Sequence, residues 1–418
     1  MKRILCIFLG CLMLSACGKQ SEPAPTEPPY EAQQPTVSPT EPSDPEAILA
    51  YRRDVVEAEM RRCMSTLWSP AQDITYLVSD DDAPETAITM YADRIYQGLP
   101  YTHGSSSVYN FLSYATSQDE NGVYTVTGLE SIDLTGSVNS RQGCDCADTL
   151  FWAWAQVSNS IQFRYTAEMT EAYGIVKVGS YVCNLPKFTG STKPICTDNG
   201  EDVMFDAYSK LQKGDGMVLY TKSAGGHAVM VVDSVVQYTE DGKIDADASY
   251  VVIIEQTTGP QREEQCYYNE DIGQTVYICG AVDSVWSYSD IFKKGYLPVT
   301  CKELVDPSPL PEQSVEVTGT CETIDDLYKL NILSSHRIAS VTVTITQKNR
   351  VVQKATAYGT EDHYTGFPLL NFFNFLEKEL ILGSFDPEAL AAGKYHCAVT
   401  CRLSTGNVHT VHEFDFRK

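Results

Sequence analysis

The chain has 418 residues, 43% of them hydrophobic, and a formal net charge of −24 at pH 7. This length and apolar content predict a globular protein of about two domains. The acidic balance argues against binding nucleic acid, or docking on anionic lipid, through charge, because their phosphates would be repelled.

The first seventeen residues have the layout of a cleavable export signal. Lys2 and Arg3 are positive, residues 4–14 are apolar, and small residues lead to Cys17. The apolar run is too short to span a bilayer as a mature helix. The Leu-Ser-Ala-Cys at residues 14–17 resembles the lipobox of bacterial lipoproteins. This resemblance implies that residues 1–17 are a lipoprotein signal peptide and that a lipid on Cys17 anchors the exported chain to a bacterial membrane. An ordinary secretory signal with an incidental cysteine is the alternative.

Residues 18–45 contain eight prolines among Ser, Thr, Glu and Gln residues. Such a segment cannot bury enough apolar surface to offset the entropy lost on ordering. We therefore expect a disordered, extended tether between the anchor and the folded part of the chain.

Eleven of the fourteen cysteines follow Cys17. Export permits disulfides, and an odd number of cysteines predicts at least one thiol with a separate role. Cys144 and Cys146 do not match a zinc site, because no second suitable pair lies near them. We expect no metal or other cofactor.

Residues 46–305 show helical patterns first and strand patterns afterwards. Asp44-Pro45 begins a helix that is predicted to reach about Leu67. A second helix is predicted over residues 86–97 and a third over residues 144–157. The third is rich in aromatic residues. Strands are predicted over residues 217–220, 227–236, 250–255 and 275–279. Helices packed on an antiparallel sheet make an α+β domain.

Residues 306–311 are a proline-rich linker, and the pattern beyond them is mostly β. Alternation of apolar and polar residues predicts strands over residues 341–346 and 395–400, and partly over 408–416. We interpret residues 312–418 as a small β-sandwich of immunoglobulin-like type, interrupted by a helical piece near residues 368–380.

The candidate nucleophile is Cys146, which stands between Asp145 and Ala147-Asp148 where a loop enters the aromatic helix. A thiol at a helix start faces unpaired backbone N–H groups and the positive end of the helix dipole, and both favour the thiolate. The two aspartates oppose it by charge, so a base must contribute. Cys144 is the alternative, either as the reactive thiol or as a partner in a disulfide.

The choice of base is narrow, since only His103 and His227 precede residue 330. His227 follows two glycines, which allow the backbone to pass close to another segment. The next strand ends in Glu255-Gln256. These two side chains point to opposite faces, so only one of them can orient the His227 imidazole.

This order of cysteine, histidine and polar residue resembles the papain-fold cysteine peptidases of bacterial cell walls, namely the NlpC-like endopeptidases and CHAP-type amidases. The likeness spans about residues 86–300, and the order of its motifs carries more weight than any one of them. The motifs are Gly98-Leu99-Pro100-Tyr101 with Gly104, Asp145-Cys146-Ala147, Leu211-Gln212-Lys213-Gly214-Asp215, Gly226-His227-Ala228 and Glu255-Gln256-Thr257.

The resemblance implies a role for each matched residue. Cys146 would be the nucleophile and His227 the base. Glu255 would orient His227, with Gln256 as the alternative, and Tyr101 would lie near the thiolate. The implied reaction is attack on an amide carbonyl, formation of an acyl-enzyme and hydrolysis by water. The implied substrates are peptidoglycan stem peptides, which a tethered, exported protein would meet.

The chain departs from the family pattern in three places. Ala147-Asp148 replaces a Ser-Gly pair, Thr257 replaces an asparagine, and the stretch between Cys146 and His227 is long. Cys183 and Cys196 in that stretch are a candidate disulfide that would close a loop over the groove. These differences bear on substrate and specificity more than on fold.

Two other classes of function remain open. The papain-like domain would, if inactive, hold glycan or peptide in its groove as a cell-wall-binding lipoprotein. A transglutaminase-like Cys-His enzyme would instead require an aromatic residue soon after His227 and an aspartate on the next strand. The sequence specifies neither the bond that is cleaved nor the oligomeric state.

Overall fold

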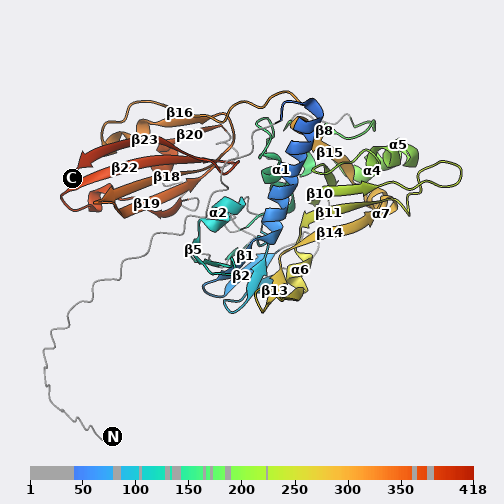
Figure 1. Cartoon of the computed structure of the whole chain (residues 1–418), viewed down its shortest axis with the longest axis horizontal. Coiled ribbons are helices and arrows are strands. Elements are labelled where there is room, and N and C mark those ends of the chain that lie inside the picture. Colours follow the sequence, from blue (N-terminus) through green and yellow to red (C-terminus); the bar gives the residue numbers. More distant parts are fainter. Residues whose placement is uncertain are drawn as a thin grey trace, which may run out of the picture.

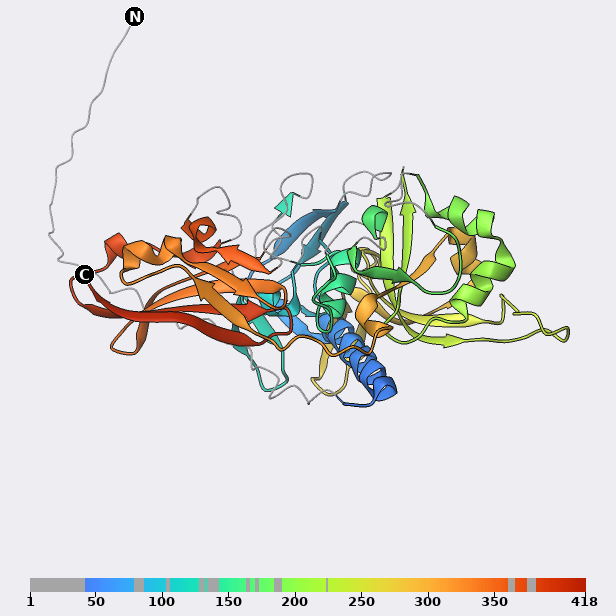
Figure 2. The same cartoon turned by 90° about the horizontal axis from the view of Figure 1, so that it is seen from above.

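The computed structural model describes residues 42–78, 86–102, 106–127, 132–133, 143–162, 166–169, 173–183, 190–222, 225–359, 365–373 and 381–418. The predicted signal, Cys17 and residues 18–41 of the tether lie outside these ranges, as do His103 and Gly104. Figures 1 and 2 show two bodies side by side, with the long helix α1 (Pro45–Ser65) between the C-terminal strands and the central sheet.

Helix α1 confirms the first predicted helix. The side chain of Asp44 caps it by accepting a hydrogen bond of 3.1 Å from the backbone N–H of Ala47, which satisfies one of the free donors of the first turn. Ser65 ends the helix two residues before the predicted limit. The helix buries Val56, Met60, Cys63 and Met64 in the main core, so its apolar face packs on the rest of the fold.

The central sheet has six antiparallel strands in the order β14-β11-β10-β9-β15-β8. Its strands are β8 (Ile175–Lys177), β9 (Gly216–Thr221), β10 (Gly225–Val235), β11 (Tyr250–Gln256), β14 (Gly280–Ser287) and β15 (Leu297–Cys301). The helices of this part of the chain are α3 (Cys146–Trp154), α4 (Thr192–Asn199), α5 (Glu201–Tyr208), α6 (Gly259–Arg262) and α7 (Tyr288–Lys294). The predicted aromatic helix and the first three predicted strands are thus confirmed, and an α+β arrangement is established.

A second six-stranded sheet has the order β12-β13-β4-β1-β6-β5, and a three-stranded sheet has the order β3-β2-β7. The strands are β1 (Leu67–Pro70), β2 (Ile74–Val78), β3 (Thr86–Met90), β4 (Ile95–Gln97), β5 (Ala115–Gln118), β6 (Tyr124–Val126), β7 (Ile132–Asp133), β12 (Cys266–Asn269) and β13 (Gln274–Ile278). A short helix, α2 (Val108–Leu112), precedes β5. The predicted strand over 275–279 is therefore present as β13, but it pairs with β4 rather than with the central sheet.

Two predictions for the N-terminal half are wrong. Residues 86–97 form strands β3 and β4 and not a helix. Thr86, Ile88 and Thr89 are β-branched, which disfavours a helix and suits a pleated surface. Strands also precede and follow α3, so the predicted order of helices first and strands afterwards does not hold.

The C-terminal residues form two sheets around a separate apolar core. One sheet has the order β16-β17-β20 and the other β21-β19-β18-β22-β23. Their strands are β16 (Val315–Thr318), β17 (Asn331–Ser334), β18 (Ile338–Gln347), β19 (Arg350–Tyr358), β20 (Gly366–Pro368), β21 (Ile381–Ser384), β22 (Lys394–Leu403) and β23 (Val408–Arg417). The predicted strands and the helical piece, seen as α8 (Leu369–Phe373), are confirmed within the described residues.

The two cores meet at the end of α3. The hydroxyl of Ser404 donates to the carbonyl of Ala155 at 2.9 Å, and the amide of Gln156 donates to the carbonyl of Ser404 at 2.8 Å. The guanidinium of Arg337 lies 5.2 Å from the centre of the Trp152 ring. The C-terminal domain thus rests on the helix that carries Cys146 at its other end. Across the described residues, no helix has the length and apolarity needed to cross a bilayer.

Candidate active site

Cys146 is the first residue of α3, where the predicted loop meets the helix. Asp145 is the N-cap, and its carboxylate accepts a hydrogen bond of 2.8 Å from the N–H of Asp148. The Asp145 side chain therefore caps the helix. The Cys146 thiol lies in the first turn, near other backbone N–H groups that have no partner within the helix. Only 4% of Cys146 is exposed.

The other end of α3 fixes this thiol against the central sheet. A side chain at Gly216 would place its Cβ 2.9 Å from Leu150 and 3.0 Å from Trp154. The Trp154 indole donates to the carbonyl of Gly214 at 2.8 Å. Because the glycine allows this close approach, the aromatic face of α3 is core packing, as its sequence predicts.

His227 lies on β10, opposite Leu219 of β9. The preceding Gly226 has no room for a side chain, since its Cβ would collide with the hydroxyl oxygen of Thr166. Thr166 belongs to a short 3-10 helix, η1 (Thr166–Glu168). The sequence predicts that Gly226 permits a close backbone approach, and the segment that approaches it is η1, which packs beside His227.

Glu255, near the end of β11, meets the His227 ring. The Nε2 atom of His227 lies 2.5 Å from a carboxylate oxygen of Glu255. This contact occupies Nε2 and leaves Nδ1 as the ring nitrogen that faces the thiol. The side chains of His227 and Glu255 are 22% and 14% exposed, so they are partly desolvated while the ring remains accessible.

The charge state of His227 follows from these contacts. Burial lowers its pKa, but the charge and hydrogen bond of Cys146, together with those of Glu255, outweigh burial and raise the pKa to about 10. Opposite charges close to a base favour its protonated form. The three residues therefore act electrostatically on one another, and the histidine is an imidazolium at neutral pH.

Gln256, the alternative to Glu255, lies on the other face of β11. It is fully buried, and its amide donates to the carbonyl of Leu99 at 2.7 Å. The Trp68 indole donates to the neighbouring carbonyl of Gly98 at 2.8 Å. Gln256 therefore holds the segment before Tyr101 and does not orient His227.

Tyr101 forms an isolated parallel bridge with Cys144. The N–H of Cys144 donates to the carbonyl of Pro100 at 3.1 Å, and the N–H of Thr102 donates to the carbonyl of Cys144 at 3.4 Å. These bonds place the backbone of Tyr101 beside the extended residues that lead into Cys146. Glycine is required at position 143, because a Cβ there would collide with the Pro100 carbonyl oxygen.

The other candidate cysteines take no part in the site. Cys144 is buried, and desolvation followed by the charges of Asp148 and Asp145 raises its pKa well above the ordinary value. Cys183 and Cys196 are both free thiols, so the candidate disulfide is not formed. The reason lies in the direction of Cys196, whose thiol points into the core and donates to the carbonyl of Tyr296 at 3.5 Å.

Tyr296 also lies close to the reactive groups, although it belongs to none of the sequence motifs. It is 3% exposed, and its ring lies 5.3 Å from that of Trp286. Desolvation, then the charges of Glu255 and Cys146, raise the pKa of its phenol, so it stays protonated beside the two acidic groups. Only the fold brings it to the site.

Among the described residues, no group of three or more His, Cys, Asp or Glu side chains is arranged to hold a metal ion. The reactive groups that the fold brings together are the thiol of Cys146, the imidazole of His227 and the carboxylate of Glu255. This set of groups suits nucleophilic attack on a carbonyl.

No family model and no curated protein matches this chain. One solved structure that it matches is the crystal structure of a tetra-tandem repeat in the extending region of a large adhesion protein. The identity is 12%, the match covers 49% of this chain and 40% of that chain, and the TM-score is 0.17. The chain thus spans less than half of that relative, and a TM-score this low carries no argument about fold or function.

Proposed function

We propose that this protein is a cysteine hydrolase that cleaves amide bonds through Cys146, His227 and Glu255. The observation that carries the proposal is the convergence of these three side chains, with Nε2 of His227 2.5 Å from Glu255 and the thiol acting on the same ring. A nucleophile, a base and a group that orients the base are the three parts that acyl transfer requires.

The reaction that these groups support has two halves. The Cys146 thiolate attacks the amide carbonyl, and the His227 imidazolium donates its proton to the departing amine as the C–N bond breaks. The neutral imidazole then removes a proton from water, which attacks the thioester and releases the acid and the thiol. Glu255 holds the ring in one orientation and stabilises its charged form.

We also propose a specific fold for each of the two domains. A thiol at the start of a helix that packs on an antiparallel sheet carrying the histidine and the carboxylate is the arrangement expected of a papain-like domain. We assign residues 46–305 to such a domain and residues 312–418 to an immunoglobulin-like sandwich that supports it. The substrate class is peptidoglycan stem peptides, which fits the lipoprotein signal inferred from residues 14–17 and the tether that follows it.

The test is alkylation of Cys146 by iodoacetamide across pH, followed by mass spectrometry, in the wild type and in His227→Ala. We expect Cys146 to react well below pH 8.5, the ordinary pKa of a free thiol, and to lose this advantage in the variant. Cys144, two residues away and buried, provides an internal reference in the same digest. Loss of reactivity at Cys146 alone would exclude general unfolding of the variant.

The alkylation experiment can also contradict the proposal. If Cys146 reacts no faster than the other cysteines and ignores His227→Ala, the enzyme proposal falls, and the chain is a tethered binding protein. If the pair is reactive, digestion of purified peptidoglycan by the wild type and by Cys146→Ala decides the substrate, because amide cleavage releases new amino groups that can be counted.

A further inference from the structure

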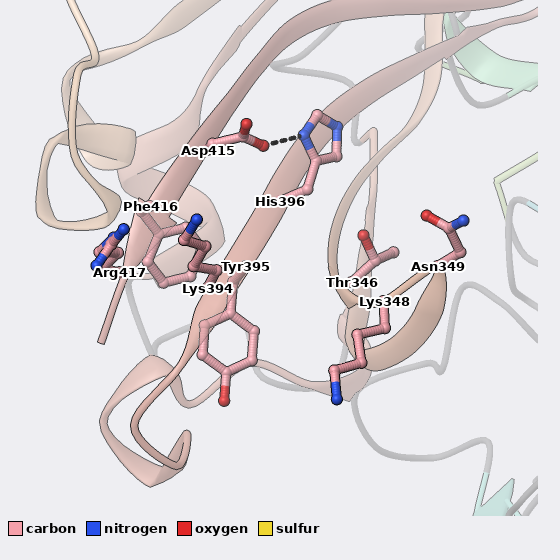
Figure 3. Close-up of a pocket in the computed structure, with 9 residues that line it drawn as sticks. All are labelled: Thr346, Lys348, Asn349, Lys394, Tyr395, His396, Asp415, Phe416 and Arg417. Carbon is pink, nitrogen blue, oxygen red and sulfur yellow. Dashed lines mark hydrogen bonds and ion pairs between the residues drawn. The ribbon is translucent and has the colours of Figure 1, made fainter.

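A second cluster of polar groups lies at the far end of the C-terminal domain, away from Cys146. Figure 3 shows nine residues around an open hollow of about 460 Å³. Three of them are cationic, Lys348, Lys394 and Arg417, and the others include Thr346, Asn349 and His396. This concentration of positive charge is notable because the chain as a whole is strongly acidic.

The strand register explains how the cations come together. Lys394 of β22 pairs directly with Arg417 of β23, and His396 pairs with Asp415 two residues along. Side chains two apart share a face of a sheet, so Lys394, His396, Asp415 and Arg417 all project from one face. Like charges directly opposite each other across two strands are unfavourable, and an anion bound between them would remove that cost.

The third cation, Lys348, lies in the turn between β18 and β19. Lys348 and Asn349 have φ values of +51° and +63°, as in a hairpin turn in which both central residues are left-handed. The turn places the two side chains beyond the end of the sheet, next to Thr346, which pairs with His396. Thr346 and Asn349 thus line the same hollow as the cations, across it from Lys394 and Arg417 (Figure 3).

One carboxylate, that of Asp415, also lines the hollow, where it is paired with His396. A carboxylate oxygen of Asp415 lies 2.9 Å from Nδ1 of His396, and a carboxylate oxygen of Glu413 lies 3.9 Å from Nε2 of the same ring. Lys418 pairs with Glu388. Within the described part of the chain, Lys348, Lys394 and Arg417 have no ion pair, so their charge is available to a ligand.

The negative net charge of the molecule does not abolish the attraction of this hollow for anions. Residues 312–418 contain thirteen acidic and ten basic residues, a net charge of −3 out of the −24 of the chain. At physiological ionic strength, charges farther apart than about 8 Å are largely screened. The charges that line the hollow, three cations and the carboxylate of Asp415, therefore determine what approaches it, and the acidic N-terminal domain has little influence there.

We propose that this hollow binds phosphodiester groups of a polyol-phosphate polymer. Arginine and lysine are the side chains best suited to phosphate oxygens, the former through two parallel hydrogen bonds. Thr346 and Asn349 supply partners for the polyol hydroxyls.

Single-stranded nucleic acid carries the same phosphodiester group but needs exposed aromatic rings on which its bases stack. The aromatic residues here do not meet that need. Tyr395 is 5% exposed, and its ring stacks on Phe416 with a centroid distance of 5.4 Å. Both rings line the hollow, but they are stacked on each other and Phe416 is half-buried, so neither offers a free platform for a base.

The experiment is calorimetric titration of poly(glycerol phosphate) into the chain from residue 42 onward, carrying Cys146→Ala so that no cleavage intervenes. Lys394→Gln/Arg417→Gln is the test variant. Lys293→Gln/Lys294→Gln removes two exposed cations at the end of α7 and is the matched control for net charge. Lys348→Asn, which tolerates the left-handed turn, is a second, independent test variant.

We expect wild-type binding that weakens with salt, a loss of about tenfold or more in the test double variant, a smaller loss in Lys348→Asn and none in the control. Absence of binding, or equal losses in the test and control double variants, would overturn the proposal. So would tighter binding to an oligo(dT) strand or to vesicles containing phosphatidylglycerol, since these would identify nucleic acid or lipid as the ligand. None of these outcomes depends on Cys146 being catalytic.

Discussion

Glu255 and Gln256 are adjacent in sequence but contact different parts of the molecule. The carboxylate of Glu255 reaches His227, whereas the amide of Gln256 reaches the carbonyl of Leu99. The two-residue period of a strand separates them, and the sequence alone predicts that only one can serve the histidine. Which one does so depends on which face of β11 turns towards α3, and that is a property of the packed sheet.

Glu255→Gln should lower the reactivity of the Cys146 thiol while preserving the fold. The amide keeps the shape of the side chain but removes the negative charge that helps to raise the pKa of His227. We expect alkylation of Cys146 at pH 6.5 to slow by about tenfold, the effect of one pKa unit. Glu270→Gln, at an exposed glutamate between β12 and β13, is the control. An unchanged rate in Glu255→Gln would remove Glu255 from the proposed site.

The pH dependence of hydrolysis follows from the same residue. His227 is protonated below a pKa of about 10 and neutral above it. Because the departing amine takes its proton from this ring, kcat/KM for a peptidoglycan fragment should fall as the pH rises through about 10. A histidine with the ordinary pKa of about 6.5 would give that fall near neutrality. Rates measured from about pH 6 to 11 separate the two cases, and a fall near pH 6.5 contradicts the charged pair.

At the scale of single elements, the contact between η1 and β10 positions the histidine. A Cβ on Gly226 would collide with the Thr166 hydroxyl oxygen and would lie 2.5 Å from the Thr166 Cβ. Gly226→Ala must therefore displace η1 or bend β10, at a cost of about 1–3 kcal/mol. We expect lower stability to denaturant and slower alkylation of Cys146.

The control for this prediction is Gly190→Ala, where a Cβ would meet nothing within 4 Å. Adding Thr166→Gly to Gly226→Ala removes the colliding side chain and should restore part of the loss. If Gly226→Ala behaves like Gly190→Ala, the packing of η1 does not position His227.

The pairing of Lys394 with Arg417 also has a consequence for stability. Directly opposed like charges destabilise a pair of strands by a few tenths of a kcal/mol. Lys394→Thr relieves this repulsion and adds a β-branched residue to β22, so the free energy of unfolding should rise by about 0.5 kcal/mol. Thermal unfolding at low salt measures it, and the gain should shrink at high salt. A loss of stability would mean that Lys394 already has a favourable contact.

At the scale of the whole molecule, local chemistry was easier to predict than architecture. The cap at Asp44, the aromatic face of α3 and the alternating strands of the C-terminal domain each follow from short-range patterns. The second six-stranded sheet does not, because β1, β4 and β6 have only three or four residues each. Runs that short are too short to show a hydrophobic period, and the pairing of β4 with β13 joins residues far apart in sequence.

The same distinction applies to the site. The sequence predicts Cys146, His227 and Glu255 from residue type and local context, because a helix start, a glycine pair and a strand end are visible in it, and the fold brings these three side chains together. Tyr296 was not, since it approaches Glu255 and Cys146 only through tertiary packing. The candidate disulfide between Cys183 and Cys196 is not formed for a related reason. Sequence spacing gives no information on whether a thiol points outward or, as at Cys196, into the core.

The buried Arg52 connects the two halves of the molecule. Its guanidinium donates to the carbonyls of Glu303, Asp306 and Ser308, at 3.0, 2.8 and 2.7 Å. These bonds fasten the linker that leads to the C-terminal domain onto α1. A buried cation that satisfies three carbonyls is costly to remove, because each carbonyl is then left without its donor.

Arg52→Met keeps the unbranched stem but removes every donor. We expect a loss of about 2–4 kcal/mol in the free energy of unfolding, because one buried and two partly buried carbonyls lose their donor and are only partly rehydrated. Because the linker is then released from α1, calorimetry should show the two cores unfolding in separate transitions where the wild type shows one. Arg61→Met removes an arginine of the same helix that pairs on the surface with Glu57 and Asp283, and it should cost less than about 1 kcal/mol. A single transition in Arg52→Met, with stability equal to that of Arg61→Met, would show that the remaining contacts between the domains, at the end of α3 and at α2, suffice to couple them.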